Sequence, residues 1–305
     1  MSDLHFVIFK GLVETLDFKI CRFIDFLRRK DIDFWQVDVN DIRTYNGHDF
    51  ERFISEERCV VFTYNNIGIN LSVDGVNTWK KYNIPFFSFL VDHPRNFDDA
   101  LLHPPCDINV LCCDRDHVEF VRRFYPEVKE VFFVPQGGME VNSLVPTGDR
   151  PIDVIYMGSN TSFYGYPRIP FIEDGGADFY SFCVSYLCSF TMETADKAID
   201  LFLANNPALQ EYELELHLSY GEYIQSAVRR KFKLDCMHAI DDAGIHVDIY
   251  GNEWEDADRP FSDNIAIHKI IPLNDLLNIV RTAKISLCFV PWFKRGSSEK
   301  ILIPC

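Results

Sequence analysis

Residues 108–135 read INVLCCDRDHVEFVRRFYPEVKEVFFVP, which is the pattern of a β-strand, an α-helix and a second β-strand. The stretch begins and ends with apolar runs of strand length. Between them, Asp116 and Glu119 have the spacing of a capping box, which predicts a helix that runs to Tyr125 and ends at Pro126. Strands that alternate with helices in this way predict a parallel sheet covered by helices.

The same alternation extends in both directions from this unit. Upstream, apolar runs predict strands at residues 5–9, 34–39, 59–64 and 84–92, with helices over 16–30 and up to residue 83. Downstream, strands are predicted at 151–159, 246–251, 265–271 and 285–291, helices at 194–204, 223–243 and 273–282, and a long irregular loop at 163–178. The repetition indicates two domains of one kind.

We therefore predict an α/β fold with two Rossmann-like domains, one over residues 1–138 and one over 151–305. Residues 139–150 are polar and contain a proline and a glycine, which is typical of a linker. The second domain ends where a further helix is expected after Gly296, and a doubly wound domain continues beyond that point. The sequence thus predicts an incomplete C-terminal domain.

Charge and cysteine placement exclude several classes of protein. The formal net charge of −16 makes the chain repel nucleic acid and anionic membranes over most of its surface. No apolar run is long enough to cross a membrane, and the N-terminus does not resemble a signal peptide. The ten cysteines include no C-x-x-C pair, and several lie in strand-like runs. These features predict reduced thiols, no structural zinc site and a cytoplasmic location.

In doubly wound sheets, ligands bind beyond the carboxyl ends of the strands. The residues that follow predicted strands are therefore candidates for a site in a cleft between the two domains: Gly11, Asp92, His93, Gly137, Gly138, Gly158, Ser159, Asn160, Tyr250, Gly251, Asn252 and Trp292. Asp92 and His93 form either an acid/base or substrate-binding pair, or a turn in which Asp92 is the cap and Pro94 holds His93.

Two glycine-serine turns are candidates for binding phosphate. The first turn is Gly158, Ser159, Asn160, Thr161 and Ser162. Its backbone N–H groups and serine and threonine hydroxyls suit a phosphate, although an ordinary strand-to-helix turn has the same composition. Later in the chain, basic side chains surround a second turn and can neutralise a pyrophosphate, unless they only form a solvated loop. The residues of this basic turn are Lys294, Arg295, Gly296, Ser297, Ser298 and Lys300.

Asp114 and Asp116 form a D-x-D pair after an apolar strand. Two carboxylates suit a hard cation, as in metal-dependent glycosyltransferases of the single-domain fold. We favour the alternative in which Asp116 is the N-cap of the following helix. The histidines, including His217, are scattered singly and are predicted to be surface or core residues rather than metal ligands.

Several segments together resemble bacterial glycosyltransferases of the spore-maturation-protein (CgeB-like) type, which are similar to the large retaining group of two-domain GT-B enzymes. The segments span nearly the whole chain: FLVDHPRNF, NVLCCDRDHVEFVRRFYP, VFFVPQGG, PIDVIYMGS, HVDIYGNEW and SLCFVPWFKRGSSEK. Lys300 matches the basic residue that such enzymes carry after the glycine-serine turn. The last five residues, ILIPC, depart from the family pattern.

The resemblance implies an acceptor-binding N-terminal domain and a C-terminal domain that binds a nucleoside-diphosphate sugar as substrate, with no cofactor and no metal. It implies retention of configuration, Lys294 and Lys300 near the diphosphate, and Asp92 or His93 near a glycan, protein or small-molecule acceptor. Gly11, Gly137 and Gly138 would line the acceptor side of the cleft. A non-catalytic GT-B remnant that acts as a binding module is the alternative, and the metal-dependent single-domain transferase is a third.

Overall fold

The computed structural model describes residues 4–41, 43, 47–137, 145–255, 259–289 and 294–296. The chain forms two compact units, the first ending at Pro135 and the second beginning at Gln136. Each contains a parallel β-sheet with helices, as the sequence predicted. Of the predicted linker, residues 139–144 lie outside the described residues, and Thr147–Asp149 form a short 3-10 turn.

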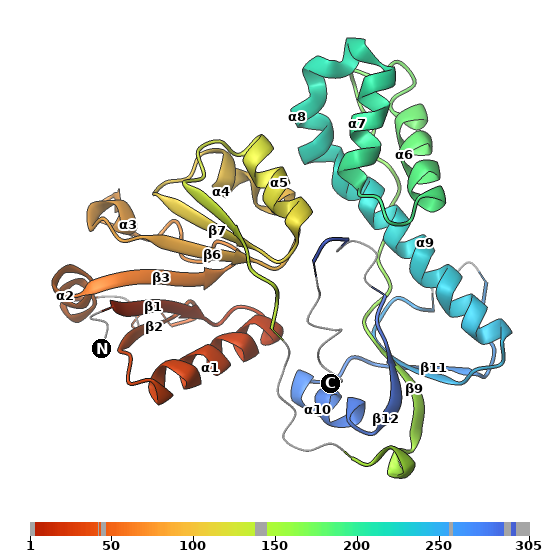
Figure 1. Cartoon of the computed structure of the whole chain (residues 1–305), viewed down its shortest axis with the longest axis horizontal. Coiled ribbons are helices and arrows are strands. Elements are labelled where there is room, and N and C mark those ends of the chain that lie inside the picture. Colours follow the sequence, from red (N-terminus) through yellow and green to blue (C-terminus); the bar gives the residue numbers. More distant parts are fainter. Residues whose placement is uncertain are drawn as a thin grey trace. The chain divides into compact units, whose positions relative to one another are not determined.

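The first unit is built on six parallel strands in the order β2-β1-β3-β6-β7-β8 (Figure 1). These are β1 (Leu4–Lys10), β2 (Phe34–Asp38), β3 (Arg58–Tyr64), β6 (Phe86–Leu90), β7 (Ile108–Cys112) and β8 (Glu130–Phe133). The small strands β4 (Ser72–Val73) and β5 (Val76–Asn77) pair in a separate hairpin. The order reverses at β1, so the crevice expected of a doubly wound sheet lies at the carboxyl ends of β1 and β3.

Helices connect these strands, and one begins two residues away from its expected start. They are α1 (Glu14–Arg29), α2 (His48–Glu56), α3 (Thr78–Lys81), α4 (Asp98–Leu102) and α5 (Arg115–Phe124). The predicted cap of α5 was wrong, because Asp114 rather than Asp116 is its N-cap: an Asp114 carboxylate oxygen accepts the Asp116 N–H at 2.7 Å. The Asp114 side chain is 1% exposed. Capping of α5 and binding of a cation by Asp114 and Asp116 would therefore compete for the same carboxylate. Helix α2 was not predicted.

The second unit contains four parallel strands in the order β11-β10-β9-β12. They are β9 (Ile152–Met157), β10 (Val247–Tyr250), β11 (Ile265–His268) and β12 (Ala283–Leu287). Helix α9 (Gly221–Asp242) precedes β10, and α10 (Leu273–Val280) precedes β12. The order 3-2-1-4 corresponds to the first four positions of the Rossmann order 3-2-1-4-5-6, with its switch point between β9 and β12.

A helical insertion separates β9 from β10. It contains α6 (Ala177–Ser189), α7 (Ala195–Asn205), α8 (Glu213–Glu215), a π-helical turn over Leu216–Tyr220 and the first turns of α9 (Figure 1). Its core is distinct from that of the sheet and includes Phe179, Cys183, Ile199 and Phe202. Helix α6 was not predicted, because its apolar residues lie on most of its faces and give little helical contrast.

Two predictions from composition can be compared with the described residues. Among these residues, no helix is both long and apolar enough to cross a lipid bilayer. Nine of the cysteines are described, and each is a free thiol.

Candidate functional site

The carboxyl ends of β9 and β10 are joined by backbone hydrogen bonds. The Gly158 N–H donates to the Tyr250 carbonyl, and the Asn160 N–H donates to the Asn252 carbonyl, each at 3.0 Å. The structure thus brings together six residues that the sequence placed in a nucleotide-sugar site: Gly158, Ser159, Asn160, Tyr250, Gly251 and Asn252. The loop after β10 lies directly against the turn after β9.

Gly251 makes this close contact possible. A Cβ atom at this position would lie 2.3 Å from the carbonyl oxygen of Gly158 and 2.7 Å from the backbone nitrogen of Ser159. Both are backbone atoms, which cannot swing aside as a flexible side chain can. Only glycine therefore fits here without displacing the turn after β9.

Side chains of the second loop fix the turn further. The Ser159 hydroxyl accepts the Asn252 N–H at 3.0 Å, and the indole N–H of Trp254 donates to the Gly158 carbonyl at 2.9 Å. Trp254 is fully buried and packs edge-on against Tyr156 of β9 with ring centroids 5.5 Å apart. Glu253 accepts a hydrogen bond from the Ser162 hydroxyl. The turn is consequently rigid.

Two basic side chains of α9 reach the same turn. The Lys233 ammonium donates to the Ser159 carbonyl at 2.8 Å and to the Thr161 hydroxyl at 3.2 Å. Arg230 lies three residues earlier on α9 and donates to the Thr161 carbonyl at 3.2 Å. Lys233 is only 5% exposed. Two basic side chains are therefore held at the carboxyl end of β9, although neither residue was among the sequence candidates.

Asn160 has an unused donor beside these cations. Its side chain is 4% exposed, and its carbonyl oxygen accepts the Thr161 N–H at 2.9 Å. Its amide nitrogen has no hydrogen-bond partner within the part of the chain that the structure describes. An unsatisfied buried donor costs free energy, so its presence in the turn that Lys233 and Arg230 contact favours an anionic or oxygen-rich ligand here.

The backbone of the turn differs from the sequence expectation. Free N–H groups were expected to face a phosphate, but those of Gly158, Asn160 and Thr161 all bond within the protein. These three amides are therefore not available to a phosphate in this conformation. At the end of β10, the Tyr250 ring stacks on His268 with centroids 4.5 Å apart, and burial raises the pKa of the Tyr250 phenol.

The basic turn near the end of the chain is described only at residues 294–296. The Lys294 ammonium donates to the carbonyl of Thr191, just beyond α6, and burial lowers its pKa. Its hydrogen bond thus links it to the helical insertion rather than to the turn after β9. Trp292, Ser297, Ser298 and Lys300 lie outside the described residues.

In the first unit, Asp92 and His93 have different environments. Asp92 is exposed, and its carboxylate accepts a hydrogen bond from Asn65, which follows β3, at 3.3 Å. His93 is 8% exposed and caps the 3-10 turn Pro94–Phe97 by accepting the Arg95 N–H at 3.2 Å. Its ring also contacts Phe120 with centroids 4.6 Å apart. The turn is therefore capped by His93 rather than by Asp92, and the catalytic role of His93 stays a prediction.

The glycines assigned to the acceptor side of the cleft lie in different environments. Gly11 has a φ of +85°, donates its N–H to Asp17 at 2.9 Å and accepts from Asn40 at 2.7 Å. It therefore forms a tight turn after β1, where a left-handed backbone favours glycine. A Cβ at Gly137 would have no neighbour within 4 Å. Gly138 lies outside the described residues.

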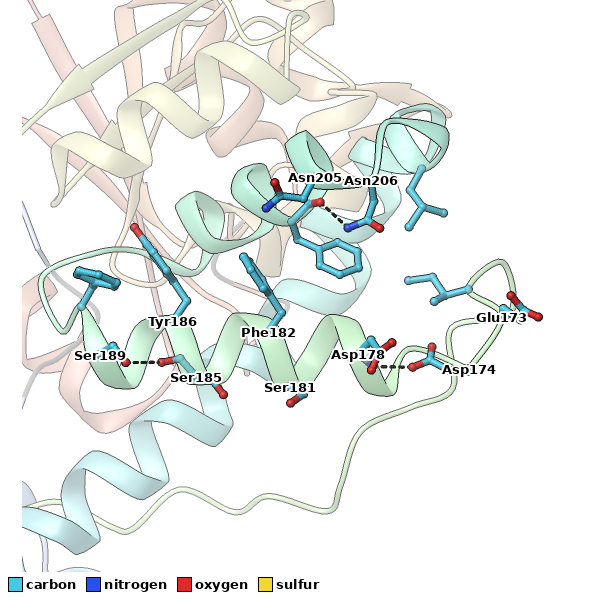
Figure 2. Close-up of a pocket in the computed structure, with 14 residues that line it drawn as sticks. Glu173, Asp174, Asp178, Ser181, Phe182, Ser185, Tyr186, Ser189, Asn205 and Asn206 are labelled. Atoms are coloured by element: carbon cyan, nitrogen blue, oxygen red, sulfur yellow. Dashed lines mark hydrogen bonds between the residues drawn. The ribbon is translucent and has the colours of Figure 1, made fainter.

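The helical insertion has a groove of about 850 Å³ along α6. Phe182 and Tyr186 project from the side of α6 on which Asn205 of α7 lies, and Glu173 and Asp174 lie at one end (Figure 2). The rings of Phe182 and Tyr186 are nearly parallel, with an interplanar angle of 7°. Flat rings beside amides and carboxylates are groups that can contact both the apolar faces and the hydroxyls of a sugar.

The comparisons with known proteins give no identification. No protein-family model matches the chain, and no curated protein matches it significantly. The resemblance to CgeB-like glycosyltransferases therefore stays a prediction from the sequence.

Proposed function

We propose that the chain transfers a hexosyl group from a nucleoside-diphosphate sugar to an acceptor, and that the donor diphosphate binds at the carboxyl end of β9. One observation carries the proposal: buried Lys233 and the unsatisfied amide of Asn160 flank the turn after β9. This turn lies on a central strand next to the switch point of the sheet, where doubly wound folds bind their ligands.

The chemistry of glycosyl transfer suits these groups. When the bond between the anomeric carbon and the diphosphate breaks, negative charge grows on the leaving oxygen. A positive charge already held in a buried position stabilises that charge without reorganisation. Lys233 and Arg230 supply such charge, and Asn160 supplies a neutral donor. In this proposal they carry out the stabilisation that the sequence assigned to Lys294 and Lys300.

The first unit would then bind the acceptor. Asp92 is the exposed carboxylate at a strand end, and a carboxylate can accept the proton of an attacking hydroxyl. We keep Asp92 as the candidate base and assign His93 to the structure of the turn.

Calorimetry tests the donor site. The chain is titrated with UDP, ADP, GDP and CDP, and we expect one of them to bind with a 1:1 stoichiometry. Lys233→Gln should weaken that binding by about tenfold or more, because a charge-assisted hydrogen bond contributes about 1.5 kcal/mol or more. To test turnover, the chain is incubated with the matching nucleotide sugar, and the nucleoside diphosphate released by hydrolysis is measured.

Lys231→Gln is the matched control for this experiment. Lys231 lies two residues away on α9, carries the same charge, is 55% exposed and pairs with Asp235 at 2.8 Å. Its substitution should leave nucleotide binding unchanged. If no nucleoside diphosphate binds, or if the two variants lose the same affinity, the donor site is not at the end of β9.

The groove on α6 favours a second candidate function, a non-catalytic carbohydrate-binding module. A glycan array with the whole chain tests it, and Tyr186→Ala should abolish any binding found. Retention of glycan binding together with failure to bind nucleotides would favour this module over the enzyme.

A further inference from the structure

His217 lies at the centre of a carboxylate cluster in the helical insertion. It is fully buried in the π-helical turn Leu216–Tyr220, a rare helix type that is frequent at functional sites. Asp196 and Asp200 lie one turn apart on α7, and each has a carboxylate oxygen within hydrogen-bond distance of one ring nitrogen: Nδ1 lies 3.1 Å from Asp196 and Nε2 lies 3.1 Å from Asp200. The ring is thus held in one orientation.

Glu213 of α8 completes a set of three possible metal ligands. One ligand atom from each of Asp200, Glu213 and His217 lies within 4.8 Å of the other two. Two atoms bound at about 2.1 Å to one zinc ion lie about 3.4 Å apart at a tetrahedral angle and about 4.2 Å apart across the ion. Shifts of about half an ångström in the carboxylates therefore place all three on one ion.

The surroundings also have the features of a metal site. Metal-binding histidines usually donate their other ring N–H to a carboxylate, which orients the ring, and Asp196 is in that position on Nδ1. The side chain of Asp200 is 33% exposed, whereas that of His217 is 0% exposed. The cluster is consequently open on the carboxylate side, where an ion can enter and keep a water molecule as a further ligand.

We propose that Asp200, Glu213 and His217 bind a divalent first-row transition-metal ion, with Asp196 as the partner that positions His217. One imidazole nitrogen and two carboxylates suit Zn²⁺. The ion would join α7, α8 and the π-helical turn, which are separate segments of the insertion. It is independent of the diphosphate site at β9 and takes no part in the proposed transfer.

The competing account is a metal-free ion pair. A protonated His217 between Asp196 and Asp200 would clamp the same segments together. Zinc must displace the proton on Nε2, whereas the ion pair needs no metal at all. The two accounts therefore differ in whether the purified chain binds zinc at this place.

Zinc titration distinguishes them. The whole chain is treated with EDTA, dialysed and titrated with ZnCl₂ in a calorimeter, and we expect one ion per chain. Glu213→Gln removes one anionic ligand but keeps both contacts of His217, so it should fold normally by circular dichroism and bind zinc at least about tenfold more weakly.

Glu211→Gln is the control, because it removes the same charge from an exposed position two residues away. It should bind zinc as the natural chain does. Absence of stoichiometric zinc binding, or equal affinity of the two variants, overturns the proposal. Lys233→Gln should keep full zinc affinity, so failure of the zinc site and failure of the diphosphate site are separate results.

Discussion

Replacing Gly251 by alanine tests the close packing of the candidate donor site. The added Cβ would lie 2.3 Å from the Gly158 carbonyl oxygen, whereas a comfortable contact begins at about 3.5 Å. The loop after β10 and the turn after β9 must therefore separate by about 1 Å. Hydrogen bonds that are now 3.0 Å long, from Gly158 to Tyr250 and from Asn160 to Asn252, would then exceed the hydrogen-bond range.

The expected loss of stability follows from these contacts. Two hydrogen bonds contribute about 1 kcal/mol each, and overpacking at a rigid contact costs about 1–3 kcal/mol. We expect the free energy of unfolding of the second unit to fall by about 3–5 kcal/mol. Urea unfolding measures it, and Trp254 provides a fluorescence signal because its indole N–H donates to the Gly158 carbonyl.

Gly137→Ala is the control for this variant. It adds the same methyl group in the same unit, where no atom lies within 4 Å of the new Cβ. Its unfolding free energy should stay within about 0.5 kcal/mol of the natural chain. If Gly251→Ala unfolds at the same urea concentration as Gly137→Ala, the contact between the two loops is not as close as the structure shows.

Two further predictions concern titratable groups. A thiol reagent at neutral pH should label exposed Cys21 and Cys188 in the folded protein, whereas Cys106 and Cys183 should react only after unfolding, because burial raises their pKa values to about 11 and about 12. Peptide mass spectrometry identifies the labelled residues, and labelling of Cys183 in the folded protein would contradict its burial. The hydrogen bond from the Ser262 hydroxyl lowers the pKa of Asp241, so its ionised form stabilises the fold above the ordinary pKa of about 3.9, and this contribution is lost as the pH falls. Asp241→Asn should therefore cost about 1–2 kcal/mol at pH 7 and less at pH 3 in urea unfolding, and a cost that is equal at both pH values would refute the assignment.

Periodicity in the sequence was sufficient for the two parallel sheets and for much of the helix placement, but not for the small hairpin of β4 and β5. In α1, Leu16, Ile20, Ile24 and Leu27 are all buried, as their helical spacing requires. The residues after β9 and β10 could also be selected, because the carboxyl ends of neighbouring parallel strands lie at one edge. The boundaries were less accurate: the strand expected over 285–291 is β12, which ends at Leu287.

Contacts that depend on the path of the chain could not be predicted. Lys233 contacts Ser159 across 74 positions, and that contact depends on how the crossover helix α9 lies on the sheet. A signal was present, because RRKFK at residues 229–233 is a basic run in a chain of net charge −16. The cluster around His217 was equally hidden, since its ligands are singly placed in the sequence and meet only through a π-helical turn.

Helix α9 connects the two proposed sites through a continuous backbone. Its first turns pack in the core of the insertion through Ile224, and its later turns pack against the sheet through Leu234 and Met237 (Figure 1). His217 lies just before the helix, and Lys233 lies about 24 Å further along at 1.5 Å per residue. The insertion therefore does more than extend the loop after β9, because its packing sets where α9 begins, and the course of α9 places Lys233 on the turn at Ser159.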